Sequence, residues 1–416
     1  MRALLLLILP LAAGHALAVD DEAAALSLAD KAEATPQAAS DWRVFVEATG
    51  ASSALRGGSG TENDAHLFLN AHYDKTFAPG WRAVFADLLD SHWQDGISHQ
   101  NMVNTVIDAY LSWQLEPDAI ADAGRINTRY GAGFGYNPTD YFRANAIRSI
   151  VSIDPASLRE NRLGSVMARG QLLWPASSLT ALYSPKLASQ PSVNAFDPDF
   201  GATNFADRWL LVASSQISKN FNPQFLIYGK AGESPQFGVN LTTLVNDATV
   251  AYVEYSGGRR PSLLSQALML APDTAFRLQL ATGFTYTTEG NLSLTMEYEY
   301  NGAGLDQEGW DALRSGPPAT YARYRVFAAD VQDPPTTQRM FFNAKWQDAL
   351  VRHFDLSAFS YYDIVDSSRQ FWVEARYHWT HVDVALQWQL NSGAPRSEYG
   401  GVPARRVWQA VATYFF

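Results

Sequence analysis

Arg406-Val-Trp-Gln-Ala-Val-Ala-Thr-Tyr-Phe-Phe416 closes the chain, and its side chains alternate in character with a period of two. One face of this stretch carries Trp408, Ala410, Ala412, Tyr414 and Phe416. A period of two is typical of a β-strand. Aromatic rings at both ends of one face, with small apolar side chains between them, suit a strand that crosses a bilayer with its rings at the two interfaces. The alternative is a soluble β-sandwich that ends in Phe, and the rest of the chain decides between the two.

The start of the chain has the pattern of a secretory signal peptide. A basic Met1-Arg2 precedes an apolar run from Ala3 to Ala13, and Ala16-Leu-Ala18 is a small-x-small cleavage site. We therefore predict a signal peptide over 1–18, followed by a periplasmic tail or short helix over 19–41. No later stretch reaches the roughly 18 consecutive apolar residues that a membrane helix needs.

Two-periodic segments recur from Trp42 to the end of the chain, with turn signals between them. They predict strands near 42–50, 65–74, 80–91, 103–115, 121–130, 164–174, 178–186, 207–219, 224–231, 236–245, 248–256, 275–287, 292–301, 337–348, 355–364, 369–379, 382–391 and 405–416. Compact connections mostly alternate with longer ones, as in barrels that have short periplasmic turns and long outer loops. An even number of strands then puts both chain ends in the periplasm.

The predicted strands carry apolar side chains on one face and polar ones on the other. In 292–301, for example, Leu294 and Met296 alternate with Glu297 and Glu299. A charge that faces lipid costs several kcal/mol, whereas a charge that faces water in a lumen costs little. The sequence therefore predicts an all-β fold for 42–416: a transmembrane antiparallel β-barrel of about 18 strands (range roughly 14–18), a size that encloses an aqueous channel.

Seven arginines and only three carboxylates lie between residues 125 and 169 of a chain whose net charge is −11. We take this group as the candidate pore lining: Arg125, Asn127, Arg129, Arg143, Arg148, Arg159, Arg162 and Arg169. Arg125, Asn127 and Arg129 share one face of the predicted strand 121–130. We favour the strand arginines, because strands position side chains better than loops do.

Four of the seven arginines belong to the long connection over 131–163. A loop of this length is usually functional or disordered, and its apolar side chains argue against disorder. One interpretation is that it folds into the lumen, where its arginines and those of the flanking strands form an anion-attracting constriction. The other is an outer loop whose arginines bind lipopolysaccharide phosphates or pair with neighbouring carboxylates.

This region, the number of strands and the C-terminal Phe416 resemble Gram-negative outer-membrane porins, and in particular the alginate-export type of eighteen-stranded barrel. The shared motif is a Gly-Arg strand that leads to an Asn-Pro-x-Asp turn, here Gly124-Arg125 and Asn137-Pro-Thr-Asp140. The resemblance implies a passive conduit in the outer membrane, surrounded by lipid and lipopolysaccharide, for small anionic solutes or an anionic polysaccharide. It also implies that Tyr414 and Phe416 form the signal that the barrel-assembly machinery reads.

Other classes of function find less support in the sequence. The scattered histidines form no recognisable metal or catalytic motif, so we expect no enzyme, no cofactor and no metal. The net charge of −11 argues against nucleic acid as a partner. Two carboxylate pairs, Asp197 with Asp199 and Asp330 with Asp333, are interpreted as solvated turn residues, since they lack the ligands of a calcium loop. A barrel with an adhesive, structural or lipopolysaccharide-contacting role and no open pore is the alternative function.

Deletion of Phe416 tests the role assigned to the C-terminal residues. We expect the variant to be exported normally but to reach the membrane as folded barrel in reduced amount, because the assembly signal is incomplete. Heat-modifiable migration on a detergent gel measures the folded fraction. Folded protein at the wild-type level would show that Phe416 is no part of the signal.

Overall fold

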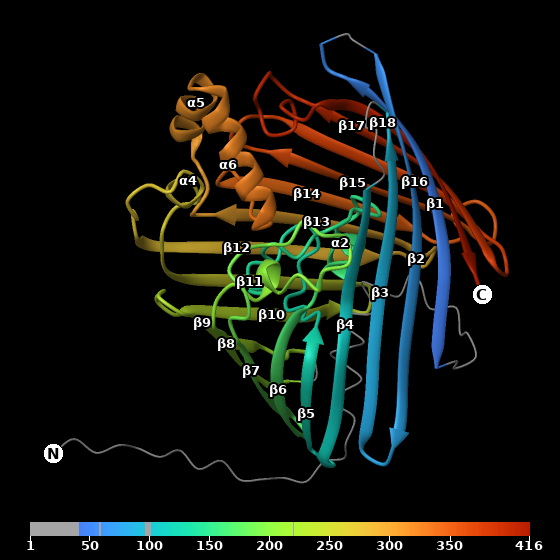
Figure 1. Ribbon diagram of the computed structural model, residues 1–416, viewed down its shortest axis with the longest axis vertical. Coiled ribbons are helices and arrows are strands. Elements are labelled where there is room, and N and C mark those ends of the chain that lie inside the picture. Colours follow the sequence, from blue (N-terminus) through green and yellow to red (C-terminus); the bar gives the residue numbers. More distant parts are fainter. Residues whose placement is uncertain (1–40, 58–59, 96–100, 219) are drawn as a thin grey trace.

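The computed structural model describes residues 41–57, 60–95, 101–218 and 220–416. In it, 18 strands form one antiparallel sheet that closes on itself (Figure 1). The first strand, β1 (Trp42–Leu55), pairs with the last, β18 (Ala404–Phe415), with Phe45 opposite Phe415. The predicted eighteen-stranded antiparallel barrel is therefore confirmed. The predicted signal peptide over 1–18 and the tail or helix up to residue 40 lie outside the described residues.

Every predicted strand has a counterpart in the barrel. The strands between β1 and β18 are β2 (Thr61–Ala78), β3 (Trp81–Gln94), β4 (Asn101–Glu116), β5 (Ala119–Ile126), β6 (Ser165–Trp174), β7 (Ser177–Ser184), β8 (Arg208–Ser215), β9 (Gln224–Lys230), β10 (Gln236–Asn246), β11 (Thr249–Arg260), β12 (Ala275–Thr287), β13 (Leu292–Asn301), β14 (Gln338–Trp346), β15 (Phe354–Asp363), β16 (Arg369–His378) and β17 (Val382–Ser392). Each is hydrogen-bonded to the strands before and after it in sequence.

Several predicted strand boundaries are wrong, and two of them bear on the interior of the barrel. The stretch 51–64 is not a long loop, because the β1–β2 ladder continues through polar residues as far as the pair Ala54 and Thr61. β5 ends at Ile126 and not near residue 130, so Asn127 and Arg129 lie beyond the strand. The alternation of polar and apolar side chains marks only the part of a strand that faces lipid. The hydrogen-bond ladder can extend beyond that part, as in β1 and β2, or end before it, as in β5.

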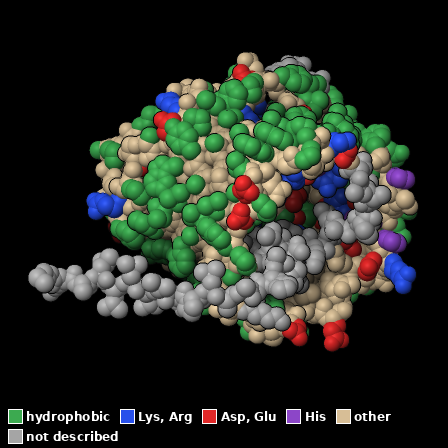
Figure 2. All heavy atoms as spheres, turned by 90° about the horizontal axis from the view of Figure 1, so that it is seen from below, with side chains coloured by type: hydrophobic (Ala, Val, Ile, Leu, Met, Phe, Trp, Pro, Cys, Tyr) green, Lys and Arg blue, Asp and Glu red, His purple; other side chains and the backbone are tan. Residues whose placement is uncertain are grey.

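The outer face of the barrel is apolar and the inner face is polar, as predicted. On β13, Leu294 and Met296 are 43% and 40% exposed, whereas Glu297 and Glu299 are fully buried. β18 repeats the pattern, with Trp408 exposed and Thr413 buried. Figure 2 shows a wide area of hydrophobic side chains beside a hollow where acidic and basic side chains gather.

The two rims of the barrel differ. Both ends of the described chain lie on one rim, where the Phe416 N–H donates to the carbonyl of Val44 (3.2 Å). The turns after the even-numbered strands share this rim. The opposite rim carries the connections after the odd-numbered strands, and these contain every described helix: α2 (Pro155–Glu160), α3 (Phe200–Thr203), α4 (Leu263–Ala267), α5 (Gln307–Ser315) and α6 (Pro318–Asp330). Which rim faces the periplasm stays a prediction.

Helices α4, α5 and α6 pack together at this opposite rim, called the helix-bearing rim below (Figure 1). α5 begins where the Asp306 side chain accepts a hydrogen bond from the Gly309 N–H, and α6 begins with Pro318 at its first position. Trp310 of α5 and Tyr324 of α6, both fully buried, lie in their shared apolar core. Among the described residues, none of the helices has both the length and the apolar character to cross a membrane.

Single cysteines on the two rims test the predicted orientation, since the chain has no native cysteine. We expect cysteines at Gln190 and Ser315, in connections of the helix-bearing rim, to react with a membrane-impermeant maleimide on intact cells. Cysteines at Gly290 and Leu350, on the other rim, should react only after the outer membrane is broken. The reverse labelling pattern would invert the topology.

Candidate functional site

Loop 131–163, between β5 and β6, contacts one arc of the barrel wall through its middle part. The Ser149 hydroxyl donates to Asp90 of β3 (2.5 Å). Val151 packs against an apolar cluster from β2 to β4 that includes Phe68 and Leu88. These contacts fix the middle of the loop to the inner face of β2, β3 and β4.

The first part of the same loop contacts the opposite arc. The carboxylate of Glu297 on β13 accepts hydrogen bonds from the N–H groups of Phe134 (2.8 Å) and Tyr136 (3.0 Å). Glu254 on β11 accepts from the Gly133 N–H. Because the loop contacts both arcs, it crosses the interior of the barrel, and Figure 1 shows it there between β4 and β11.

These contacts show that part of the polar inner face, which the sequence predicts to line an aqueous channel, is covered by the loop. Glu254 and Glu297 face inward as the alternation requires, but both are fully buried under the loop. Their oxygens bind backbone N–H groups of the loop where the sequence interpretation expected water. At this level the polar inner face is therefore a binding surface for the chain itself.

Glycines allow the loop to approach these carboxylates. Gly131 has a φ of +93°, and a Cβ there would lie 2.2 Å from an oxygen of Glu254. At Gly135 a Cβ would lie 2.4 Å from an oxygen of Glu299. Any side chain at these positions would displace the carboxylates, so glycine at both positions allows the close packing.

The Asn137-Pro-Thr-Asp140 segment forms the predicted turn. The Asp140 N–H donates to the Asn137 carbonyl (3.2 Å), and the Asn137 amide donates to the Gly133 carbonyl (2.6 Å). The Asp140 carboxylate pairs with Arg162 (2.7 Å), and both side chains are 2% exposed. The turn and this buried ion pair join the two ends of the loop.

Most of the candidate arginines hold the loop in place. Arg125 is an exception: it is buried and donates to the carbonyls of Gly164, directly after the loop, and of Pro198, between β7 and β8. Arg159 donates to the carbonyls of Gly131 (3.3 Å) and Gly133 (3.1 Å). Arg148 donates to the carbonyl of Asn104 (3.0 Å) and lies 3.6 Å from Asp199.

Two of the candidate arginines keep substantial exposed surface. The side chain of Arg129 is 45% exposed and lies 3.7 Å from Glu160. The side chain of Arg169 is 20% exposed and pairs with Asp122 at 2.7 Å. Asn127, beyond the end of β5, accepts from Arg162 (2.8 Å) and donates to the Arg159 carbonyl (3.0 Å). That any of these side chains lines a pore stays a prediction.

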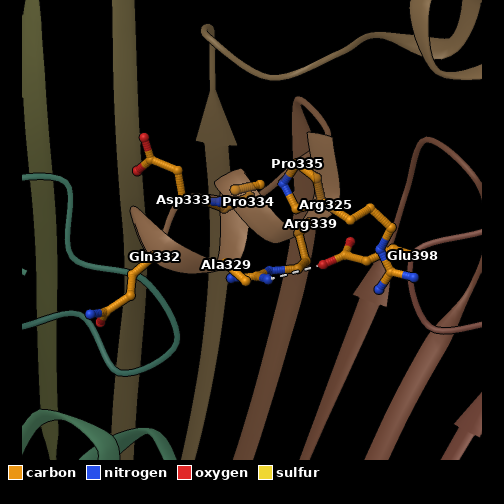
Figure 3. Close-up of a pocket in the computed structure, with 9 residues that line it drawn as sticks. Arg325, Ala329, Gln332, Asp333, Pro334, Pro335, Arg339 and Glu398 are labelled. Atoms are coloured by element: carbon orange, nitrogen blue, oxygen red, sulfur yellow. Dashed lines mark ion pairs between the residues drawn. The ribbon is translucent and has the colours of Figure 1, made fainter. Parts of the chain in front are cut away.

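A cavity of about 230 Å³ lies where α6 meets β14 and the β17–β18 connection (Figure 3). Its charged lining residues are Arg325, Asp333, Arg339 and Glu398. Arg339 lies 2.6 Å from Glu299 and 3.6 Å from Glu398. Arg325 donates to the Tyr321 hydroxyl (3.0 Å) and makes no ion pair within the described part of the chain.

Asp333 connects this cavity to loop 131–163. It pairs with Arg143 of the loop and with Arg260 at the end of β11 (3.0 Å). Burial alone would raise the pKa of Asp333, but the two guanidinium groups outweigh burial and lower it, so Asp333 is charged. Burial, together with the neighbouring Asp363, raises the pKa of Glu398 well above its ordinary value, which favours its uncharged form.

Several of these residues were missed or misinterpreted in the sequence. Asp333 and Asp199, interpreted as solvated turn residues, are both buried and paired with arginines. The sequence predicts only a surface loop at Arg260, and it gives no signal for Arg325 and Arg339, which also lie far along the chain from the arginine-rich stretch. Of the charged residues around the cavity, only Glu299 was indicated by the sequence, because the alternation in β13 places it on the inner face.

The closed barrel and the loop that crosses it define a class: the fold is that of an outer-membrane, eighteen-stranded, porin-like β-barrel. One solved structure with this fold is OccAB1 of Acinetobacter baumannii, with a TM-score of 0.57, 10% identity and coverage of 90% of this chain and 96% of that chain. Another is OpdL of Pseudomonas aeruginosa, with a TM-score of 0.55, 11% identity and coverage of 91% and 99%.

A third solved structure, OccK5 (OpdH) of Pseudomonas aeruginosa, has a TM-score of 0.54, 9% identity and coverage of 90% and 98%. No family model and no curated protein matches the chain. At such low identity the likeness establishes the fold and nothing finer. The alginate-export subtype stays a prediction.

Arg162→Ala tests whether the buried arginines hold the loop. We expect it to lower the free energy of unfolding by about 3–5 kcal/mol, because it leaves the Asp140 carboxylate buried without its partner. Arg129→Ala is the matched control: its ion pair is solvent-exposed, so the loss should be below about 1 kcal/mol. Urea unfolding of the barrel in lipid vesicles measures both. Equal effects would show that Arg162 is no special anchor.

Proposed function

We propose that this chain is an outer-membrane porin that lets small anions diffuse through a lumen narrowed by loop 131–163. The observation that carries the proposal is the arginine cluster around the cavity at the helix-bearing rim: Arg143, Arg260, Arg325 and Arg339. Export by the signal peptide, insertion by the assembly machinery, and contact with lipid and lipopolysaccharide are parts of the same proposal.

The charges around the cavity favour an anion. Four arginines lie there with four carboxyl groups, Asp333, Glu299, Asp363 and Glu398, of which Glu398 favours its uncharged form, so positive charge is in excess. Inside a barrel, fixed charges act across low-dielectric walls and little water, so an excess of positive charge has more effect than on an open surface. The excess would raise the local concentration of anions although the whole chain is acidic.

The size of the cavity favours a small solute. Its volume, about 230 Å³, is below the roughly 300–1,000 Å³ of pockets that take drug-sized ligands. A small carboxylate or inorganic anion fits this space better than a segment of polysaccharide does. We therefore favour a small anionic solute over the anionic polysaccharide that the alginate-export resemblance implied.

The arginines of the sequence prediction keep a role in this proposal. Arg129 and Arg169 retain exposed surface, and both flank loop 131–163. Each has a carboxylate nearby, so its contribution to an anion-attracting potential is reduced. Arg325, which makes no ion pair within the described part of the chain, is the stronger candidate.

Arg325→Glu tests the proposal directly. We expect the ratio of anion to cation permeability, obtained from the reversal potential in a planar bilayer under a salt gradient, to fall by at least about twofold. The matched control is Arg323→Glu, the same charge reversal on an exposed residue of α6 that does not line the cavity. The control should leave the ratio near the wild-type value.

Three outcomes distinguish the alternatives. An open, anion-preferring wild-type channel whose selectivity shifts only with Arg325→Glu supports the proposal. Equal shifts in both variants would mean that the cavity is not on the permeation path. A wild-type barrel without measurable conductance would refute the porin and favour an adhesive, structural or lipopolysaccharide-contacting role.

A further inference from the structure

Three potential metal ligands converge on the inner face of the barrel near the helix-bearing rim. They are Asp64 and His66 on β2 and His92 on β3, and one ligand atom from each lies within 4.8 Å of the others. The cluster is separate from the arginine cavity and from the residues that hold the first part of the loop. The sequence gave no sign of it, because the histidines are far apart along the chain.

Strand geometry brings these residues together. Asp64 and His66 are two positions apart on one strand, so their side chains emerge on the same face. His66 lies directly opposite His92 in the β2–β3 register. Their rings stack with centroids 4.1 Å apart and planes inclined by only 6°. The two imidazoles and the carboxylate therefore form one compact group.

A second carboxylate sets the orientation of His66. This second carboxylate is Asp90, and Nδ1 of His66 lies 2.9 Å from one of its oxygens. Nε2 of His66 is then directed at Asp64, 3.5 Å away. When Nδ1–H of a neutral imidazole donates a hydrogen bond to Asp90, Nε2 keeps a free electron pair for a metal ion. A carboxylate behind a histidine in this manner is the usual outer support of a zinc ligand.

The surroundings allow an ion to enter. The side chains of Asp64 and His66 are 30% and 15% exposed, whereas Asp90 is buried. A tetrahedral zinc ion with bonds of about 2.0–2.1 Å needs its ligand atoms about 3.4 Å apart. Because the two rings are nearly parallel, at least one imidazole must turn about its Cβ–Cγ bond before an ion can lie in the plane of both rings. The ligand atoms already lie within 4.8 Å of one another, and a water molecule or solute would occupy the fourth position.

We propose that Asp64, His66 and His92 bind a divalent transition metal ion of the zinc type at the mouth of the barrel, with Asp90 as the orienting carboxylate. Two imidazoles and one carboxylate suit Zn²⁺ and disfavour Ca²⁺ and Mg²⁺, which prefer oxygen ligands. The proposal does not depend on permeation, and it differs from the expectation that the chain has no metal site.

The site is joined to loop 131–163 through Asp90. One oxygen of Asp90 contacts His66, and the other accepts the hydrogen bond from Ser149 of the loop. An ion that fixes His66 also fixes Asp90, and with it the anchor of the loop on this arc. Metal binding is therefore expected to make the middle of the loop more rigid.

Calorimetric titration of the folded, full-length protein in detergent with Zn²⁺ tests the proposal. We expect one ion per barrel, and at least about tenfold weaker binding in His92→Gln and in Asp64→Asn, because each removes a ligand. Asp90→Asn should weaken binding by about 10–100-fold, as the loss of an outer-shell partner does. The matched control His72→Gln removes a histidine from the same strand and face, and binding should stay unchanged.

Two further measurements keep the test decisive. Heat-modifiable migration shows whether each variant forms a barrel, and only folded variants are compared. Co²⁺ in place of Zn²⁺ should give the intense visible absorption of a tetrahedral site in the wild type and lose it in His66→Ala/His92→Ala. Wild-type protein that binds Zn²⁺ no more tightly than this double variant would overturn the proposal, as would equal weakening by His72→Gln.

Discussion

The pairing of β1 with β18 is the interaction on which the rest of the molecule depends. A bilayer offers no water to backbone N–H and C=O groups, so a sheet in it is stable only when no edge is left unpaired. The ladder from Phe45 opposite Phe415 to Leu55 opposite Ala404 removes the last edge. Closure separates an apolar outside from a polar inside, and this separation makes the interior available for charged side chains.

The polar interior then organises the loop. Glu254, Glu297 and Glu299 occupy inward positions that the strand period requires to be polar. Such buried carboxylates need hydrogen-bond donors. The loop supplies backbone N–H groups to Glu254 and Glu297, and glycines let its backbone come close enough. The donor to Glu299 is the guanidinium of Arg339. The alternation of apolar and polar side chains along the strands therefore has two effects: it gives the barrel an apolar outer face, and it places the carboxylates that hold the loop.

The sequence predicts the wall of this barrel well, because each strand carries its own evidence in a period of two. It predicts the interior poorly, because interior contacts join residues that are far apart in the chain. Arg143 and Asp333, for example, are 190 residues apart. An excess of arginine is visible in the sequence, but the carbonyls and carboxylates that Arg125 and Arg162 bind are not. The same limit applies to His66 and His92, which only the β2–β3 register brings together.

The loop that crosses the barrel has a mechanical consequence. It contacts β3 through Ser149 and Asp90, and it reaches β15, where the Tyr361 hydroxyl donates to the Gly135 carbonyl across 226 positions of sequence. A hollow cylinder of sheet flattens easily under lateral pressure, whereas one with a strut between opposite walls keeps its cross-section. The strut can take its place only when both walls exist, so the loop reaches its final position late in folding, after β15 has joined the sheet.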